Sequence, residues 1–454
     1  MPKTSVHLDW IDSFVEKIRP FVHVRLTDRT LIRMPNQAFK LNKTGAFLLH
    51  HILKGGSIKD ILKGRSFDKE LPTQLHTFFS DLSRVLNSSL CDEYTSSSLE
   101  RINFELEYIT LPVLSEVALT WRCNIKCQFC YASCRCISGS SDESDLEELS
   151  TSAVKRVLSI ISRDAEVPSV SFTGGEPVLR PDLSELIAYA SSSLGMRVNL
   201  ITNGTLISEQ LAMEFKESGL ASAQVSIESP DEAVHDELCG VKGAFKASLN
   251  GLKALKNAGV AVHPHSTLCR SNKSSLYRMA QFAELLGVDR FSLNMIIPAG
   301  RGINEALSVK YSEVKDIILR IQSASDSAGI EFMWYSPTPL CLFNPISHQL
   351  GNKGCSACEG LLSIDPFGRV LPCSSWKDPV GDLLQEGFKP IWFGERGQFL
   401  REKRMAHPNC RECDHFAVCH GACPLYFKAY GYDEIALPLE RVKNNIELHQ
   451  RSLS

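Results

Sequence analysis

Residues 114–130 read LSEVALTWRCNIKCQFC, an apolar run followed at once by three cysteines. The segment EVALTW is typical of a buried strand, so Cys123, Cys127 and Cys130 lie on a loop at its carboxyl end. In a βα barrel that end carries the active site. Three thiolates can hold three irons of a [4Fe–4S] cluster and leave the fourth iron open to a chelating ligand. A zinc loop completed by Cys134 or Cys136 is the alternative, because structural zinc takes four protein ligands.

The sequence on either side of this loop extends the pattern into a barrel. From about residue 114, strand-like runs alternate with amphipathic helices, which predicts a parallel sheet. The strand-like runs are EVALTW, SVSF, RVNLIT, AQVSI, VAVH and FSLNMII. Six strand–helix units predict an α/β fold with a partial (β/α)6 barrel. We place this domain at residues 101–335, with a last helix over 310–328.

The first 100 residues have a different pattern. Three extended pieces between 22 and 45 precede a helix capped by Asn42, a short helix capped by Ser57 and a third helix over 71–86. Strands followed by three helices predict a winged-helix-like domain at residues 1–100. The serine-rich stretch TSSSLE at 95–100 is the expected linker.

Residues 336–454 have little apolar periodicity and many cysteines. A β-hairpin is predicted around Pro366-Phe367-Gly368. The chain has 16 cysteines and begins without an apolar signal segment, so metal ligation is a better explanation than disulfides. The C-terminal cysteines are Cys355, Cys358, Cys373, Cys410, Cys413, Cys419 and Cys423. Two structural zinc sites are the alternative to iron–sulfur clusters.

Composition limits the partners. The net charge is −3, which gives no basic field for nucleic acid, and no run is long enough to span a membrane. We therefore expect a soluble, cytoplasmic protein. Three further cysteines and two histidines are interpreted as core packing. They are Cys91, Cys239, Cys269, His263 and His265.

A second motif follows the strand SVSF. Thr173-Gly174-Gly175-Glu176-Pro177 combines glycines, which permit close backbone approach, with a carboxylate that can accept from an ammonium group. A plain strand-to-helix turn is the alternative. Later strands end in Asn203 and in Ser226-Ile-Glu228, where ordinary turn or strand-end polarity is equally consistent.

The cysteine loop, with Phe129 before its last cysteine, resembles the signature of the radical SAM superfamily. This resemblance implies that the open iron binds S-adenosylmethionine (SAM) and that reductive cleavage yields a 5′-deoxyadenosyl radical. It also implies cofactor-binding roles for the polar strand ends. These residues are Phe129, Gly174, Gly175, Glu176, Asn203, Ser226 and Glu228. The segment MIIPAGRG at 295–302 lies where the family closes over adenine.

The C-terminal cysteines resemble the SPASM domain, which carries auxiliary [4Fe–4S] clusters. The resemblance assigns Cys355, Cys358, Cys373 and Cys423 to the first auxiliary cluster. It assigns Cys410, Cys413 and Cys419 to the second. No cysteine follows Cys423, so the fourth ligand of the second cluster is open, with Cys341 as a candidate.

The N-terminal run LN-x-TG-x7-L-x-GG-S-x-x-D-I resembles the PqqD-like peptide-recognition domain. The three domains in this order resemble radical SAM maturases of ribosomally synthesised peptides. The resemblance implies hydrogen abstraction from a precursor peptide bound by the N-terminal domain, with a reductant such as ferredoxin or flavodoxin. The alternatives are a related enzyme acting on a tetrapyrrole or cofactor precursor, and a non-catalytic iron–sulfur electron carrier.

Overall fold

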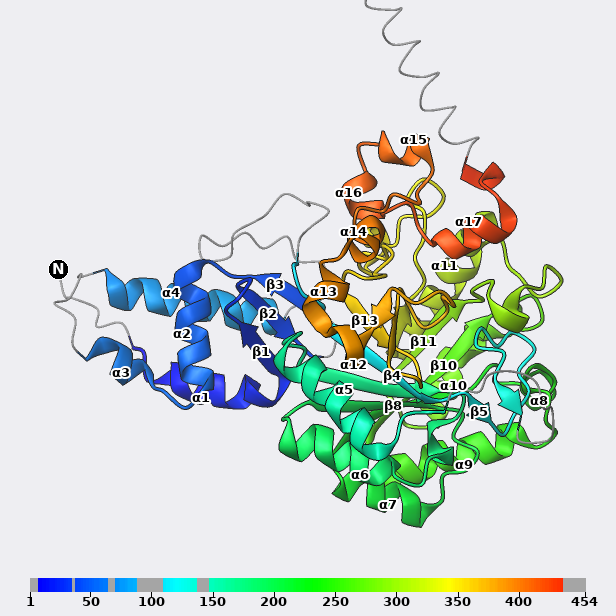
Figure 1. The fold of residues 1–454 in the computed structure, drawn as a ribbon, viewed down its shortest axis with the longest axis horizontal. Coiled ribbons are helices and arrows are strands. Elements are labelled where there is room, and N and C mark those ends of the chain that lie inside the picture. The colour runs from blue at the N-terminus through cyan, green and yellow to red at the C-terminus, as the bar shows by residue number, and fades with distance from the viewer. Residues whose placement is uncertain (1–6, 35–36, 64–69, 88–108, 137–146, 436–454) are drawn as a thin grey trace, which may run out of the picture.

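The computed structural model shows a small N-terminal lobe beside a larger barrel lobe, with a helical C-terminal region above the barrel (Figure 1). It describes residues 7–34, 37–63, 70–87, 109–136 and 147–435. Cys91, the TSSSLE linker and the boundary at residue 100 lie outside these ranges. The domain limits 1–100, 101–335 and 336–454 stay predictions.

The barrel lobe contains the six predicted strands, and each pairs in parallel with the next along the chain. They are β4 (Leu114–Thr120), β7 (Ser169–Gly174), β8 (Arg197–Thr202), β9 (Leu220–Ser226), β10 (Ala261–Leu268) and β11 (Arg290–Met295). The predicted α/β partial barrel is therefore confirmed.

Both edges of this sheet extend beyond the prediction. A seventh parallel strand, β12 (Glu331–Trp334), pairs with β11. At the other edge β13 (Leu361–Ile364) runs parallel to β4 and pairs antiparallel with β14 (Arg369–Leu371), which pairs with β15 (Gly381–Asp382). The hairpin predicted at Pro366–Gly368 thus forms, and it belongs to the barrel sheet.

Helices cover the outer face of the sheet (Figure 1). They are α5 (Thr151–Arg163), α6 (Leu183–Ala188), α7 (Glu209–Glu217), α8 (Glu232–Cys239), α9 (Ala244–Asn257), α10 (Met279–Leu285) and α11 (Tyr311–Ala328). Val117 and Leu119 of β4 share the buried core with α5. Because side chains alternate along a strand, Glu116 and Thr120 point to the inside of the barrel.

The N-terminal lobe has its own hydrophobic core. Its elements are α1 (Trp10–Ile18), β1 (Val22–Arg25), β2 (Thr30–Arg33), β3 (Gln37–Lys40), α2 (Lys43–Leu53), α3 (Ile58–Leu62) and α4 (Leu71–Asn87). The predicted caps are confirmed: Asn42 accepts from the Gly45 N–H, and Ser57 forms a capping box with Asp60. Helix α1 was not predicted.

Short helices make up the C-terminal region. They are α12 (Leu383–Glu386), α13 (Phe388–Trp392), α14 (Glu395–Arg401), α15 (Pro408–Arg411), α16 (Phe416–Cys419) and α17 (Pro424–Tyr430). No described helix is long and apolar enough to cross a membrane.

A buried ion pair joins the N-terminal lobe to the segment that enters the barrel. Arg25 is 1% exposed and binds Asp28 through Nε (2.8 Å) and Nη2 (2.7 Å). Its remaining N–H groups donate to the carbonyl oxygens of Pro112 and Leu111, at 2.8 and 3.1 Å. Burial opposes ionisation of Asp28, but the bonds from Arg25 lower its pKa overall.

Replacing Arg25 with Met should destabilise the chain by about 3–5 kcal/mol, because Asp28 is left buried without its partner. Chemical denaturation at pH 7 measures this loss. Because the folded pKa of Asp28 is lowered, the contribution is present at neutral pH and is lost as pH falls below about 4. The Arg25→Met/Asp28→Leu double variant should recover most of the stability. Wild-type stability in Arg25→Met would contradict this role.

Candidate active site

The three signature cysteines lie together at the carboxyl end of β4. Cys123, Cys127 and Cys130 belong to one apolar group that also contains Cys134 and Cys239. The sulfurs of Cys130 and Cys134 are 3.7 Å apart. The hydrogen bond from Cys134, with help from the nearby Arg301, lowers the pKa of Cys130 to about 6. The loop therefore presents clustered free thiols, one of them readily ionised, as thiolate ligation requires.

Among the described residues, no group of three Cys, His, Asp or Glu side chains stands close enough to hold one metal ion. A [4Fe–4S] cluster binds each thiolate at a different iron, so its ligands stand further apart than those of a single ion. The strand β6 (Arg135–Cys136) pairs with β5 (Arg122–Cys123) through the backbone.

Gly174 and Gly175 hold the start of the cysteine loop by direct backbone contact. A Cβ atom on Gly175 would lie 2.1 Å from the Arg122 carbonyl oxygen, and one on Gly174 would lie 2.3 Å from that of Thr120. Gly174 also has φ +134°. The N–H of Gly175 donates to Thr120 O at 2.8 Å. The close approach expected of these glycines is thus made to the cysteine loop itself.

Glu176 is fully buried, and its carboxylate connects two strand ends. Oε1 accepts from Thr202 Oγ1 (2.7 Å) and Val178 N (3.1 Å), and Oε2 accepts from Asn203 N (2.8 Å). Burial raises its pKa to about 7. These bonds leave room for one further donor, so its contact with a SAM ammonium stays a prediction.

Asn203 reaches the cysteine loop directly. Its Nδ2 donates to Asn124 Oδ1 at 2.9 Å and lies 4.0 Å from Cys123 Sγ. Its Oδ1 accepts from the backbone and hydroxyl of Thr205. Asn203 therefore does more than form a turn, since it links β8 to the loop.

The C-terminus of α8 lies against the other side of the loop. The backbone N–H groups of Lys126 and Gln128 donate to the carbonyls of Cys239 and Leu238, at 3.0 and 2.9 Å. The prediction that Cys239 is only core packing was incomplete, because Cys239 is buried directly beside Cys127. The motif spacing gave no sign of this contact, since 112 positions separate the two residues in the sequence.

Glu228 and Ser226 end β9 on the same side of the barrel. Glu228 is 2% exposed, and Oε2 accepts from Thr267 N at 2.7 Å. Burial raises its pKa to about 7. Its negative charge is close enough to raise the pKa of Cys127, after the larger effects of Cys239 and burial.

Arg301 is a site residue that the sequence analysis did not single out within MIIPAGRG. Its Nε donates to the Cys127 carbonyl (2.9 Å), and its backbone N–H donates to that of Cys130 (2.9 Å). A Cβ on Gly300 would lie 2.3 Å from Tyr131 O, and one on Gly302 would lie 3.1 Å from Phe129 O. This segment therefore packs on the cysteine loop.

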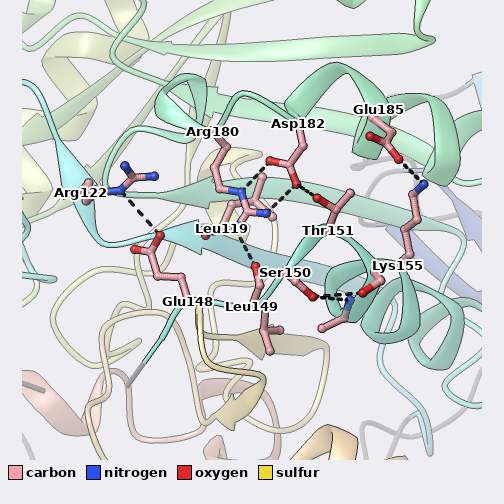
Figure 2. Close-up of polar contacts among 12 residues, drawn as sticks. Leu119, Arg122, Glu148, Leu149, Ser150, Thr151, Lys155, Arg180, Asp182 and Glu185 are labelled. Carbon is pink, nitrogen blue, oxygen red and sulfur yellow. Dashed lines mark hydrogen bonds and ion pairs between the residues drawn. The ribbon is translucent and has the colours of Figure 1, made fainter. Parts of the chain in front are cut away.

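A polar network fixes the approach to the loop from α5 (Figure 2). Arg180 binds Asp182 through two nitrogens and donates to the carbonyls of Leu119 and Leu149. Glu148 accepts from Thr120 Oγ1 at 2.6 Å and from Trp121 N at 3.0 Å. These contacts tie the residues before α5 to the end of β4.

The C-terminal cysteines lie in two groups. In the first group, burial raises the pKa of Cys373, and the nearby charges of Cys355 and Cys423 raise it further. Burial also raises the pKa of Cys358, and the charge of Cys355 adds to this effect. Lys403 donates to the Cys355 carbonyl at 2.6 Å. A cationic side chain here suits a negatively charged cluster.

The second group contains Cys410, Cys413 and Cys419. Cys341 lies close to this group, because the charges of Cys419 and Cys413 act on its thiol. Together with burial, which is the larger cause, they raise the pKa of Cys341 to about 11. The structure thus brings the candidate fourth ligand to the second group. All these cysteines are free thiols. Their assignment as ligands stays a prediction.

The barrel interior carries polar side chains between the two metal-binding regions. Glu116 of β4 is held by Ser374, which follows Cys373, and Ser374 also contacts Tyr131. Burial raises the pKa of Glu116, and its Oε2 has no protein partner in the described residues. Glu116 and Tyr131 are thus linked through Ser374 to the segment that follows Cys373.

The opposite wall of the interior contains the two histidines. His265 shares a hydrogen bond of 2.7 Å with Ser292 Oγ and stacks on Tyr335. Burial lowers the pKa of His265 to about 4 and that of His263 to about 3, so both are neutral. The buried, neutral state of His263 and His265 agrees with the prediction that both histidines pack inside the barrel. Lys353 lies 6.0 Å above the Tyr335 ring, and burial lowers its pKa to about 8.

A barrel with a tri-cysteine loop at one strand end and clustered cysteines beyond it defines a class of enzyme. Residues 117–283 match the radical SAM superfamily, and residues 355–414 match the iron–sulfur cluster-binding SPASM domain. The chain is thus a radical SAM enzyme with an auxiliary-cluster domain, and its cofactors are [4Fe–4S] clusters and SAM.

The most similar curated relatives include enzymes with different substrates. The chain is 28% identical over 327 residues to an AdoMet-dependent heme synthase of Oleidesulfovibrio alaskensis, covering 67% of this chain and 80% of that protein. It is 28% identical over 320 residues to mycofactocin maturase MftC of Mycolicibacterium smegmatis, covering 69% and 78%.

Among solved structures, the chain has the fold of Streptococcus suis SuiB, solved with its precursor peptide SuiA. The TM-score is 0.66 with 17% identity, over 90% of this chain and 95% of SuiB. The enzyme anSMEcpe with bound AdoMet matches with a TM-score of 0.53 and 19% identity, over 73% and 100%.

Replacing Gly175 with Ala should prevent assembly of the loop cluster, because its Cβ would overlap the Arg122 carbonyl. Anaerobic reconstitution followed by iron and sulfide counting should show about four fewer irons than wild type. The Cys123/Cys127/Cys130→Ala variant should lose the same number. Gly329→Ala is the control, since an added Cβ there meets nothing within 4 Å, although Gly329, unlike Gly175, has positive φ. Full iron content in Gly175→Ala would contradict this role.

Proposed function

We propose that this enzyme is a maturase that modifies a ribosomally synthesised peptide by hydrogen abstraction. The observation that carries the proposal is the additional N-terminal lobe, in which β3 pairs on one side only within the described residues. The likeness to SuiB supports it, because that match covers 90% of this chain and so extends into the first 100 residues. The N-terminal lobe would bind the precursor as a PqqD-like domain does.

The open edge is β3. In the described residues β3 pairs only with β2, whereas the β1 side of the sheet faces the barrel. All four residues of β3 are partly exposed. An edge strand can bind an extended peptide by adding a strand, and the backbone groups of Ala38 face outward for such a contact.

The barrel would receive the residue to be modified. When bound, the loop cluster and SAM supply the radical that removes a hydrogen atom. Glu176, Asn203 and Arg301 hold the loop so that the cofactor is oriented, and the buried interior excludes water. Glu116 and Tyr131, which are linked through Ser374 next to Cys373, would contact the substrate.

A second candidate is a radical SAM enzyme that acts on a tetrapyrrole or a cofactor precursor. The curated heme synthases at 28% identity favour it. Lys353 also favours it, since no described carboxylate lies within ion-pairing distance of this buried cation, which suits a substrate carboxylate. This candidate gives no role to the β3 edge.

Replacing Ala38 with Pro tests the peptide proposal. Leu41 N donates to Arg29 O, so these two residues form a hydrogen-bonded pair. Hydrogen-bonded and non-hydrogen-bonded pairs alternate along antiparallel strands. Ala38, opposite Ile32, is therefore in a non-hydrogen-bonded pair, and its N–H points away from β2. Proline there removes an outward donor and leaves the existing ladder intact. Binding of the cognate peptide, sought among short peptides encoded near the gene, should weaken at least tenfold, about 1.4 kcal/mol.

Ala38→Val is the matched control and should bind as wild type. The measurement is fluorescence anisotropy with the reconstituted full chain, together with 5′-deoxyadenosine release with and without peptide. If no encoded peptide binds and a porphyrin precursor is consumed, the second candidate replaces the first. Release of no 5′-deoxyadenosine under any condition would leave only the electron-carrier alternative.

A further inference from the structure

A cavity of about 520 Å³ lies between the N-terminal lobe and the barrel. From the barrel it is lined by Pro168, Arg197 and Gly219, which stand at or just before the first residues of β7, β8 and β9. The cysteine loop follows the opposite, carboxyl end of the sheet. The cavity is therefore separate from the active site.

The cavity wall is cationic. Arg19, Lys54 and Arg197 line it together with His23 and His50, and no Asp or Glu is among its described lining residues. Burial, followed by the charge of Lys54, lowers the pKa of His23 to about 4. Because the charge of Lys54 reaches His23, no anion among the described residues neutralises Lys54 on the side that faces His23.

Two guanidinium groups have unused donors. Nε of Arg19 and Nε of Arg197 are buried and have no partner in the described residues. Arg19 still binds Glu16 and the Ile52 carbonyl through Nη2. Arg197 has no described carboxylate within 4 Å, and burial and Arg290 lower its pKa. Because both Nε atoms are closed to solvent, the donors that a ligand in the cavity could use are the terminal nitrogens of Arg197, which have no partner among the described residues.

The remaining walls are apolar and include Phe21, Met34, Leu53 and Met196. A volume near 520 Å³ is typical of pockets for small organic molecules and exceeds the need of a single inorganic ion. We propose that this cavity binds a small anion carrying at least two acid groups, phosphate or carboxylate. Because its cations come from both lobes, the ligand would hold the lobes together.

Titration calorimetry of the reconstituted full chain tests this site with two probes, pyrophosphate for phosphate chemistry and citrate for carboxylate chemistry. At least one should bind saturably, and Arg197→Gln and Lys54→Gln should each weaken it at least tenfold. Lys59→Gln is the matched control, since Lys59 is an exposed lysine of the same lobe outside the cavity.

Amide hydrogen exchange provides a second readout that does not depend on the variants. Exchange in residues 19–24 and 191–197, which line both sides, should slow when the probe is bound. Binding of pyrophosphate alone assigns phosphate chemistry, and binding of citrate alone assigns carboxylate chemistry. The proposal is overturned if neither probe binds, or if binding is unchanged in both Gln variants.

A separate observation concerns the thiol of Cys239. The backbone N–H of Glu228 donates to His235 Nδ1 at 3.0 Å, so this nitrogen carries no proton. Burial lowers the pKa of His235, which is therefore neutral with its proton on Nε2. Nε2 lies 3.4 Å from Cys239 Sγ and donates to it. In the cluster-free protein Cys127 is hydrogen-bonded to Cys239, and this contact raises the pKa of Cys127. Once Cys127 is a thiolate ligand, the Cys239 S–H is the donor that remains in this pair.

We infer that Cys239 is a positioning residue whose S–H donates to the Cys127 thiolate when the cluster is bound. This inference rests on the assignment of Cys127 as a cluster ligand. A hydrogen bond to a ligand sulfur stabilises the more negative, reduced state of a cluster, so it raises the reduction potential. His235 and α8 fix the direction of the donor.

Spectroelectrochemistry of the loop cluster tests this role. Cys239→Ala should shift its midpoint potential to more negative values, whereas Cys239→Ser, which keeps a donor, should restore it. Cys269→Ala is the matched control, since Cys269 is also fully buried but belongs to a different apolar group. Iron content confirms that each variant holds the cluster. Equal midpoint potentials in wild type and Cys239→Ala would overturn the inference.

Discussion

The cysteine loop depends on backbone contacts that are closer than any side chain permits. Gly174 and Gly175 lie against Thr120–Arg122 from one side, and Gly300 and Gly302 lie against Phe129–Tyr131 from the other. The end of α8 supplies carbonyl acceptors to the same loop. A loop with three thiols close together has no regular structure of its own, so the surrounding strand ends must fix its shape before it binds a cluster.

These contacts also explain the buried carboxylates. Glu176 and Glu228 accept hydrogen bonds from the backbone of neighbouring strand ends and have pKa values near 7 because they are buried. Each therefore has a structural function that is independent of any ligand. Their positions next to the loop still leave them able to meet a bound cofactor.

The sequence predicted the regular elements well because their signals are local. The six barrel strands, the caps at Asn42 and Ser57 and the buried face of α5 follow from periodicity and capping residues. Contacts between distant segments could not be predicted in this way. The placement of Cys239 beside Cys127, and of Arg301 on the loop, depends on how the barrel closes. The pairing of β13 with β4 is a long-range contact of the same kind.

That pairing bears on how the enzyme works as a whole. Leu361–Ile364 is hydrogen-bonded in register with Leu114–Val117, so the strand that leads to the signature cysteines and the hairpin between Cys358 and Cys373 belong to one continuous sheet. The two redox regions are consequently not on separate bodies joined by a hinge. The distance between the cysteine loop and this hairpin is therefore set by the sheet, and moving one away from the other would break the hydrogen bonds between β4 and β13.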